Sequence, residues 1–334
     1  MDPHWALRQV AFQLERAGEP TYRVRAFRRA AEVIAALPPG DLAKRVADGT
    51  LTDLNGIGKA TAGVIVDAVQ GREPVYLAKF QEPVVGGQAL RAKLKGDCHT
   101  HSDWSDGGSP IREMAEAARD LGHEWMVLTD HSPRLTVANG LSADRLRRQL
   151  EVVAELNTEL APFLVLTGIE VDILDDGSLD QHPDLLAELD VVVASVHSKL
   201  RMPAAEMTER LLTAVADPHV DILGHCTGRL VTGKGRPESQ FDAEAVFTAC
   251  RDHGTAVEIN SRPERRDPPG RLLRLAVELG CTFSIDSDAH APGQLDWLSF
   301  GCERAEECGV EPDRVINTRG AKDLLALTGQ GGTG

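Results

Sequence analysis

The spacing of hydrophobic and polar positions changes at about residue 96. Before this point, apolar side chains recur every three or four residues over 5–16 and 22–36, which is typical of amphipathic helices. Pro38-Pro39-Gly40 ends the second of these helices, and a third short helix is expected over 41–48. The sequence therefore predicts a helical front part.

A tight turn with two glycines, Gly56 and Gly58, precedes a further helical stretch over 61–69. Because glycine frees the backbone, this pattern predicts a helix, a turn and a second helix. The backbone N–H groups at the start of such a helix suit a phosphate anion, and Lys59 adds positive charge there. A plain helix turn without a ligand is the alternative interpretation.

From Gly96 onward, short apolar runs alternate with amphipathic stretches such as 110–121 and 143–160. Repeated strand–helix units of this spacing predict a parallel sheet that closes as a barrel. About seven strands are expected, one fewer than in the common eight-stranded barrel. They are placed at 96–101, 125–130, 164–172, 191–198, 221–225, 256–261 and 282–288.

The chain of 334 residues has a formal net charge of −15, and this charge is distributed unevenly. Residues 1–72 contain ten Lys and Arg against eight Asp and Glu, whereas the rest contains 26 against 43. A protein that coats nucleic acid along its whole surface would be basic throughout, so this class is excluded. Bound cations would offset part of the acidity of the larger part.

The composition favours a protein of the cytoplasm. The N-terminus lacks the basic start and apolar stretch of a signal peptide, and no apolar run approaches the roughly 20 residues of a membrane span. The six cysteines are scattered and form no C-x-x-C pair, which indicates reduced thiols. No membrane partner is expected.

Histidine and acidic residues stand at the carboxyl end of nearly every expected strand. Since residues i and i+2 of a strand point to the same side, His99 with His101, and Asp288 with His290, are expected to aim together into the mouth of the barrel. Nine residues are the candidate metal ligands: His99, His101, Asp106, His131, Glu170, His197, His225, Asp288 and His290.

Imidazole nitrogen combined with carboxylate oxygen suits zinc, manganese or iron. Nine ligands are too many for one ion, and about three protein ligands per open catalytic ion predict three divalent ions. The other five histidines are interpreted as ordinary surface or core residues, and four aspartates as supporting groups. These residues are His4, His123, His182, His219 and His253, and Asp103, Asp130, Asp172 and Asp286.

Ordered motifs from Gly96 to about Ala291 resemble those of the polymerase and histidinol phosphatase (PHP) superfamily. The motifs are Gly96-Asp97-Cys98-His99-Thr100-His101-Ser102, Ser105-Asp106-Gly107, Thr129-Asp130-His131, Ser195-Val196-His197 and Asp288-Ala289-His290. The resemblance implies a distorted seven-stranded (β/α)7 PHP barrel of the α/β class, preceded by a small all-α helix-hairpin-helix domain.

The resemblance extends to the PHP domain of bacterial family X DNA polymerases, which also begin with a hairpin-containing helical module. In that family a nucleotidyltransferase domain lies between the two parts, and the connector here is far too short to hold one. Polymerase activity is therefore not expected. The expected domains are residues 1–72 for the hairpin module, 73–95 for a linker and 96–334 for the metal-dependent phosphoesterase.

The resemblance also implies a ligand set for each ion. One ion would be held by His99, His101, Glu170 and Asp288, a second by Glu170, His197 and His225, and a third by Asp106, His131 and His290. We hypothesise that a hydroxide bridging two ions attacks phosphorus, because metal binding lowers the pKa of water from about 15.7 to about 7.

Cationic side chains are expected to hold the phosphate during this reaction. Arg265 is the first candidate because it follows the sixth strand, and Arg229 and Lys199 also follow strand ends. The alternative for each is an exposed, solvated side chain.

Three functions stay open. The first is a DNA exonuclease or 3′-end processing enzyme of DNA repair that acts on strand ends or single strands. The hairpin and the basic helix before it favour this function, and the candidate DNA-binding residues are Gly56, Gly58, Lys59, Arg25, Arg28 and Arg29. The second is a small-molecule phosphatase of the histidinol-phosphatase type. The third is a non-catalytic DNA-binding protein with a structural metal cluster.

Overall fold

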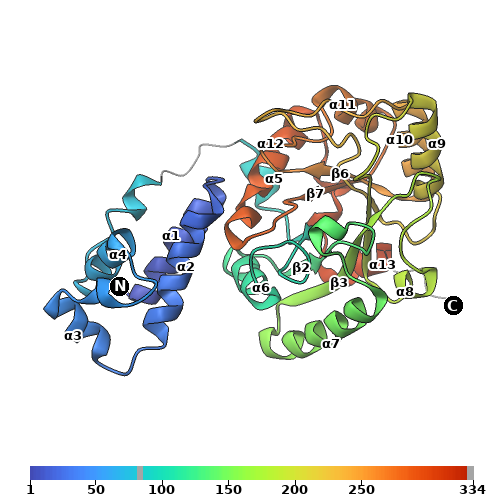
Figure 1. Cartoon of the computed structure of the whole chain (residues 1–334). Helices are drawn as coiled ribbons and strands as arrows, with labels where there is room; N and C mark the ends of the chain where they lie inside the picture. Colours follow the sequence, from blue (N-terminus) through green and yellow to red (C-terminus); the bar gives the residue numbers. More distant parts are fainter. Residues whose placement is uncertain (81–85, 329–334) are drawn as a thin grey trace. The chain divides into compact units, whose positions relative to one another are not determined.

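The computed structural model describes residues 1–80 and 86–328, which divide into two compact units, Met1–Val84 and Val85–Gly334 (Figure 1). The predicted linker over 73–95 contains the division between them, and its residues 81–85 lie outside the described residues. Tyr76 and Phe80 pack against the core of the first unit, whereas Leu90 and Leu94 are buried in the core of the second.

Helices make up the first unit, as the apolar spacing predicts. The side chain of Asp2 caps the first helix by accepting a hydrogen bond from the backbone N–H of His4 at 2.7 Å, and Pro3 begins that helix. The helices bury their apolar faces against one another. The elements are α1 (Pro3–Arg16), α2 (Thr21–Ala35), α3 (Asp41–Asp48), η1 (Leu51–Asp53), α4 (Lys59–Val69) and η2 (Leu77–Lys79).

The predicted hairpin turn lies between η1 and α4. Gly56 has a φ of +101°, and a Cβ atom at this position would lie 3.0 Å from Cγ of Arg29. Gly58 precedes α4, and its N–H donates to Oγ1 of Thr61 at 2.9 Å. The first glycine is therefore required both by its backbone conformation and by the close approach of α2.

Seven parallel strands in the order β1 to β7 form a nearly closed barrel in the second unit, which confirms the predicted fold (Figure 1). The last strand returns beside the first, because a parallel bridge joins Thr100 to Ala289. The strands are β1 (Gly96–Thr100), β2 (Trp125–Leu128), β3 (Leu164–Asp172), β4 (Val191–Ser195), β5 (Ile222–Leu223), β6 (Ala256–Asn260) and β7 (Phe283–Asp286).

Helices surround this barrel and bury the outward apolar side chains of its strands. Near the amino ends of the strands, Ile316 and Leu324 pack with Trp125 in a further apolar cluster. The helices are α5 (Gln88–Arg91), α6 (Ile111–Asp120), α7 (Ala143–Leu160), α8 (Pro183–Leu186), α9 (Ala204–Val215), α10 (Ala243–His253), α11 (Gly270–Glu278), α12 (Leu298–Glu307) and α13 (Ala321–Thr328). Short 3-10 turns are η3 (Thr136–Ala138), η4 (Pro292–Trp297), η5 (Pro312–Arg314) and η6 (Ile316–Thr318).

None of the helices within 1–80 and 86–328 combines the length and the apolar character that crossing a membrane requires.

Candidate metal centre

The structure brings all nine predicted metal ligands together at the carboxyl ends of the strands. His99 lies within β1 and Glu170 within β3, and the other seven lie on the loops that directly follow β1, β2, β4, β5 and β7. Parallel strands end at the same face of a barrel, so short loops are enough to gather residues that are nearly 200 positions apart in the sequence.

Glu170 stands at the centre of this group and is almost completely buried. Its Oε1 lies 2.9 Å from Nε2 of His225, and its Oε2 lies 2.8 Å from Nδ1 of His131. Three more imidazoles lie within 4 Å of the carboxylate: those of His99, His101 and His197. Both carboxylate oxygens thus face ring nitrogens, an arrangement in which one carboxylate can serve two ions.

A second group lies on the outer side of the cluster. Oδ1 of Asp106 is 3.5 Å from Nε2 of His131 and 3.3 Å from Nε2 of His290. One ligand atom each from His101, Asp106, His131 and His290 fits within 4.8 Å of the others. Asp288 contacts His101, which belongs to both groups: Oδ1 of Asp288 is 3.5 Å from Nε2 of His101.

The residues fit divalent cations on the evidence of their unused nitrogen atoms. Within the described residues, both ring nitrogens of His101 and of His197, and Nε2 of His99, are buried without a hydrogen-bond partner. Burying such groups unpaired is costly, so several of them facing one another need a shared partner. Imidazole and carboxylate donors of this kind suit zinc, manganese or iron.

The charges of the cluster also suit metal binding. Burial raises the pKa of Glu170, but the charges of His99 and His131 outweigh this effect and hold it well below its usual range. Burial, followed by the nearby His290, lowers the pKa of His101 well below its ordinary value. The carboxylate is therefore ionised and His101 is neutral, which are the forms that bind metal ions. Burial lowers the pKa of His99 and of His197, but Glu170 outweighs this effect and raises both above the ordinary value, so a bound cation would displace a proton from each of them.

Buried carboxylates behind the cluster hold three of the candidate ligands in place. Oε1 of Glu258, in β6, lies 2.6 Å from Nδ1 of His99, and its Oε2 accepts the backbone N–H of His225 at 2.5 Å. Oδ1 of Asp172 accepts the backbone N–H of His197 at 3.1 Å. A contact such as that between Glu258 and His99 fixes the tautomer of a ligating histidine. Sequence reasoning missed Glu258 as a site residue, although an acidic residue inside an otherwise apolar strand is a usable signal.

Asp130 holds the loop that carries Asp106. It accepts hydrogen bonds from the backbone N–H of Ser102 at 2.8 Å, from Oγ of Ser105 at 2.5 Å and from the amide of Gln149 at 2.7 Å. These bonds are consistent with the supporting role expected for Asp130.

Asp286 has a similar place beneath the cluster, since it accepts the backbone N–H of Cys98 at 2.9 Å and the amide of Asn317 at 3.0 Å. Asp103 is exposed on the loop after β1 and lies outside the groups of candidate ligands.

Neither of the two predicted ligand pairs, His99 with His101 and Asp288 with His290, lies entirely within a regular strand. The pairing of β1 with β2 shifts its register between Asp97 and Thr100, and His101 follows the end of β1. Asp288 follows β7 and has a φ of +52°, so it is not in an extended conformation. His99, within β1, and His101, in the turn that follows it, still meet, with ring centroids 5.1 Å apart.

Two arginines lie directly beside the cluster. Nε of Arg265 is 3.1 Å from Oδ2 of Asp288, and Nη1 of Arg262 is 3.3 Å from Oδ1 of the same carboxylate. Burial raises the pKa of Asp288, but Arg262 and then Arg265 hold it well below its usual range. Arg262 was not among the predicted site residues, although it is three positions from Arg265 in the same loop.

The other two predicted phosphate-binding cations have different partners. Arg229 donates from Nε to the carbonyl of Arg265 at 3.0 Å and from Nη2 to the carbonyl of Arg266, so it fixes the loop that carries Arg265. Lys199 is exposed and pairs with Asp175. The structure therefore leaves Arg265 and Arg262 as the arginines that contact the cluster.

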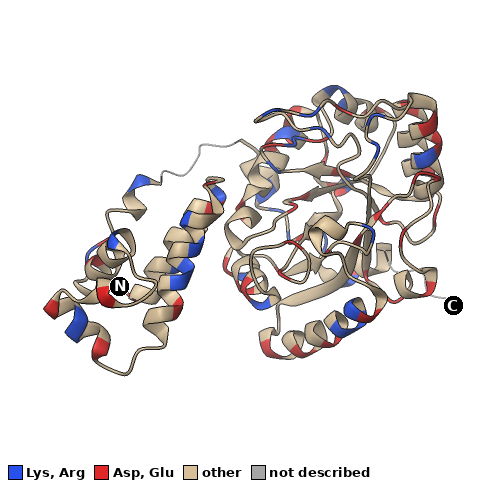
Figure 2. Cartoon of the chain, in the orientation of Figure 1, with Lys and Arg blue, Asp and Glu red and all other residues tan. Residues whose placement is uncertain are grey.

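In the helical unit, the predicted DNA-binding residues divide into two groups. Arg25, Arg29 and Lys59 are exposed, and the Arg29 side chain passes beside the turn at Gly56. Arg28 instead forms an ion pair at 2.7 Å with the buried Glu15 of α1. Figure 2 shows the basic positions along α2.

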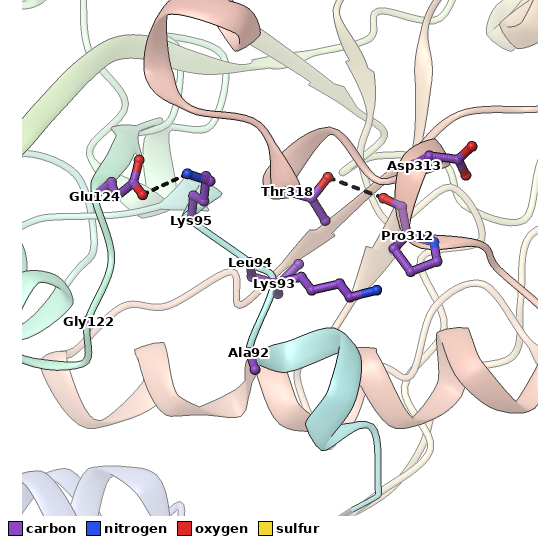
Figure 3. A pocket seen from close by; sticks show the side chains of 9 residues that line it. All are labelled: Ala92, Lys93, Leu94, Lys95, Gly122, Glu124, Pro312, Asp313 and Thr318. Atoms are coloured by element: carbon purple, nitrogen blue, oxygen red, sulfur yellow. Dashed lines mark hydrogen bonds and ion pairs between the residues drawn. The ribbon is translucent and has the colours of Figure 1, made fainter.

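A groove of about 540 Å³ opens at the amino ends of β1 and β2, away from the metal cluster (Figure 3). Lys93 and Lys95 line it, and Nζ of Lys95 pairs with Glu124 at 2.8 Å. No predicted site residue lines this groove.

Two family models match the chain. The helix-hairpin-helix domain family matches residues 2–73, and the PHP domain family matches residues 97–262. The first match falls on the helical unit, and the second falls on the first six strands of the barrel.

Similar proteins include both a polymerase and named phosphatases. DNA polymerase/3′-5′ exonuclease PolX of Bacillus subtilis (strain 168) is 44% identical over 235 residues, a match that covers 70% of this chain and 41% of that protein. This chain thus matches less than half of that relative. A probable phosphatase of Thermoanaerobacter sp. (strain X514) is 30% identical, and the match covers 68% of this chain and 91% of that protein. A probable phosphatase of Vibrio cholerae serotype O1 (strain M66-2) is 32% identical, and the match covers 71% of this chain and 96% of that protein.

Among solved structures, histidinol phosphate phosphatase from Lactococcus lactis, in complex with zinc, L-histidinol and phosphate, matches with a TM-score of 0.46 and 18% identity, over 65% of this chain and 95% of that one. The family assignment follows from the curated relatives, of which this chain covers more than nine-tenths, and from the motif residues gathered at the metal cluster. The chain belongs to the PHP family, and it joins a PHP domain to an N-terminal helix-hairpin-helix domain.

Proposed function

We propose that this metal-dependent phosphoester hydrolase acts on DNA, as a 3′-5′ exonuclease or 3′-end processing enzyme in repair. The hydrolase class follows from the family and from the metal-capable cluster. The observation that carries the proposal is the convergence of nine candidate ligand side chains, from two strands and five loops, around Glu170 and Asp106.

We also propose that the cluster holds three divalent metal ions, and that the metal is zinc, manganese or iron. The inner residues His99, His101, Glu170, His197, His225 and Asp288 would hold two of them, with Glu170 shared between both. Asp106, His131 and His290 would hold the third. When bound, such ions supply a water molecule of lowered pKa and neutralise charge on the phosphoryl oxygens.

The protein's own groups orient the substrate beside these ligands. Arg265 and Arg262 reach Asp288 from the loop after β6, so a phosphate at the mouth of the cluster meets two guanidinium groups. Arginine suits this role because its planar donors match phosphate oxygens. Arg229 acts through Arg265 by holding the loop, and Lys199 is exposed and paired with Asp175.

The helix-hairpin-helix unit supports DNA as the substrate. Arg29, Lys59 and the backbone N–H groups at the start of α4 form an exposed cationic surface beside the turn at Gly56. Such a surface binds the phosphate backbone without reading the base sequence. The residues between the two units are too few for a nucleotidyltransferase domain, so no polymerase activity is proposed. The buried, unpaired cysteines accord with a location in the cytoplasm.

A small-molecule phosphatase is the second candidate, because the relatives that match over nearly their whole length are named as phosphatases. The test measures hydrolysis of two substrates by the purified protein in the presence of Mn²⁺. The substrates are a 3′-labelled single-stranded oligonucleotide and histidinol phosphate. Stepwise shortening of the strand supports the DNA enzyme, whereas phosphate release from histidinol phosphate alone supports the phosphatase. His101→Ala is expected to abolish either activity, and near-normal turnover by this variant would contradict the proposed centre.

A further inference from the structure

The loops that surround the metal cluster carry opposite charges on its two sides. The loops after β1, β2 and β3, residues 101–110, 129–142 and 173–182, contain one basic and six acidic residues. Those after β4, β5 and β6, residues 196–203, 224–242 and 261–269, contain eight basic and four acidic residues. We call this second set of loops the basic arc; it lies in a domain that is strongly acidic as a whole.

Backbone and side-chain hydrogen bonds join the basic arc into one surface. Oγ of Ser239 donates to the carbonyl of Leu200 at 2.8 Å, which ties the loop after β5 to the loop after β4. The N–H of Val231 donates to the carbonyl of Glu264 at 2.7 Å, which ties it to the loop after β6. The cationic side chains are therefore held on a continuous rim.

The cations of this rim differ in burial. Arg262 and Arg265 lie beside Asp288. Arg236 is partly buried and is held by a hydrogen bond from its Nε to the carbonyl of Gly228 at 2.5 Å. Arg201, Lys234 and Arg266 are the exposed, outer members, and none of them forms an ion pair with a described residue.

A single phosphate at the metal cluster is matched by Arg262 and Arg265, and it leaves the three outer cations without an anion. A nucleic-acid strand supplies further phosphates at regular intervals, and proteins commonly bind such a strand with a positively charged groove that follows its backbone. The acidic loops on the opposite side disfavour a path there.

We propose that Arg201, Lys234 and Arg266 bind the backbone phosphates of single-stranded DNA next to the phosphate that is cleaved. The strand leaves the site over β4, β5 and β6. This inference rests on the proposed function, because it requires a DNA substrate for the same metal cluster.

The test replaces all three residues by alanine, Arg201→Ala, Lys234→Ala and Arg266→Ala, in the full chain. The control carries the same loss of charge at exposed positions outside the basic arc: Lys93→Ala, Arg148→Ala and Lys322→Ala. Hydrolysis of a 12-nucleotide single strand and of p-nitrophenyl phosphate is measured with Mn²⁺ over a range of salt concentrations.

In the basic-arc variant, the ratio of kcat/KM for the oligonucleotide to that for p-nitrophenyl phosphate is expected to fall about tenfold or more. The slope of log kcat/KM for the oligonucleotide against log salt is expected to become shallower by about 2, since each lost phosphate contact removes about 0.7. The control variant is expected to keep both values. Lys234→Glu alone, on an exposed turn, is expected to lower the ratio as well.

The outcomes separate this inference from the proposed function. If the wild-type protein shortens the oligonucleotide and the basic-arc variant keeps the wild-type ratio and salt slope, the inference is overturned and the proposed function stands. If the wild-type protein hydrolyses only small phosphate esters, both are overturned.

Discussion

Nδ1 of His99 lies 2.6 Å from Oε1 of Glu258 in the buried interior of the barrel. The other ring nitrogen, Nε2, lies 3.4 Å from Oε2 of Glu170. The Glu258 carboxylate thus keeps Nδ1 of His99 protonated and leaves Nε2 free for a metal ion. The same carboxylate accepts the N–H of His225, so it positions two candidate ligands at once.

Glu258→Gln is predicted to lower metal affinity by about 10- to 100-fold. One end of the glutamine amide is an NH2 group, which must face either Nδ1 of His99 or the N–H of His225. The first choice imposes the wrong tautomer on His99, and the second brings two donors together. Metal titration by calorimetry measures the change, with the exposed Glu278→Gln as the control. Equal affinity of Glu258→Gln and wild-type protein would contradict the positioning role.

Asp130→Asn is predicted to weaken metal binding at the outer group without removing a ligand. The new amide nitrogen would lie next to donors from Ser102, Ser105 or Gln149, so the loop that carries Asp106 loses part of its anchor. We expect the Mn²⁺ concentration for half-maximal activity to rise about tenfold. Asp144→Asn, on the exposed face of α7, is the control; a normal Mn²⁺ requirement in Asp130→Asn would show that the anchor is dispensable.

Neighbouring arginines on α2 are predicted to have different functions. Arg28→Ala removes the ion pair between Arg28 and the buried Glu15, so the free energy of unfolding of the helical unit is expected to fall by roughly 2–3 kcal/mol, somewhat less than for a fully buried pair. Arg29→Ala removes an exposed cation beside the hairpin turn and its exposed ion pair with Glu32 at 3.2 Å, and is expected to weaken DNA binding, with little effect on stability.

Urea unfolding and fluorescence anisotropy with a labelled oligonucleotide measure these two effects in the same preparations. The assignment fails if Arg29→Ala binds DNA as wild-type protein does, or if Arg28→Ala is as stable as the wild type.

The stability of the barrel is predicted to depend on pH through His123. Burial, together with the charge of Arg91, lowers the pKa of this histidine from 6.5 to about 3. Between these two values the unfolded chain takes up a proton that the folded chain excludes. Protonation of His123 therefore favours the unfolded chain. Above pH 6.5 this effect is absent, and as the pH drops from 6.5 toward 3 it lowers the free energy of unfolding by about 1.4 kcal/mol per pH unit.

His123→Gln is expected to make the dependence of the unfolding free energy on pH shallower below pH 6.5. A glutamine oxygen can still accept the hydrogen bond that Nη2 of Arg91 donates to Nε2 of His123 at 3.1 Å. His253→Gln, at the exposed end of α10, is the control. An unchanged pH dependence in His123→Gln would show that this histidine is protonated in the folded protein.

Much of the fold was predictable from the sequence because its signals are local. Short apolar runs and amphipathic stretches alternate from Gly96 onward, and this rhythm alone predicts seven parallel strands. That the candidate metal ligands gather in one place was predictable for a related reason, since a barrel fixes where the strands end. The helical hairpin was marked by Gly56 and Gly58, whose spacing is itself a turn signal.

Other features depended on contacts that no local pattern encodes. The sequence shows Arg28 and Arg29 as equivalent neighbours, and only the packing of α1 against α2 brings Glu15 beside one of them. Glu258 looks like one acidic residue in an apolar strand until His99 is placed opposite it. The turn conformation of Asp288, with φ of +52°, replaces the strand geometry that the two-residue spacing suggested.

The metal content of protein purified without chelators tests the central claim most directly. We predict close to three equivalents of divalent metal per wild-type chain by elemental analysis, fewer in His101→Ala, and loss of hydrolysis when the metal is removed and recovery when Mn²⁺ is restored. Wild-type protein that is isolated without metal and takes up none on incubation with zinc, manganese or iron would contradict the account.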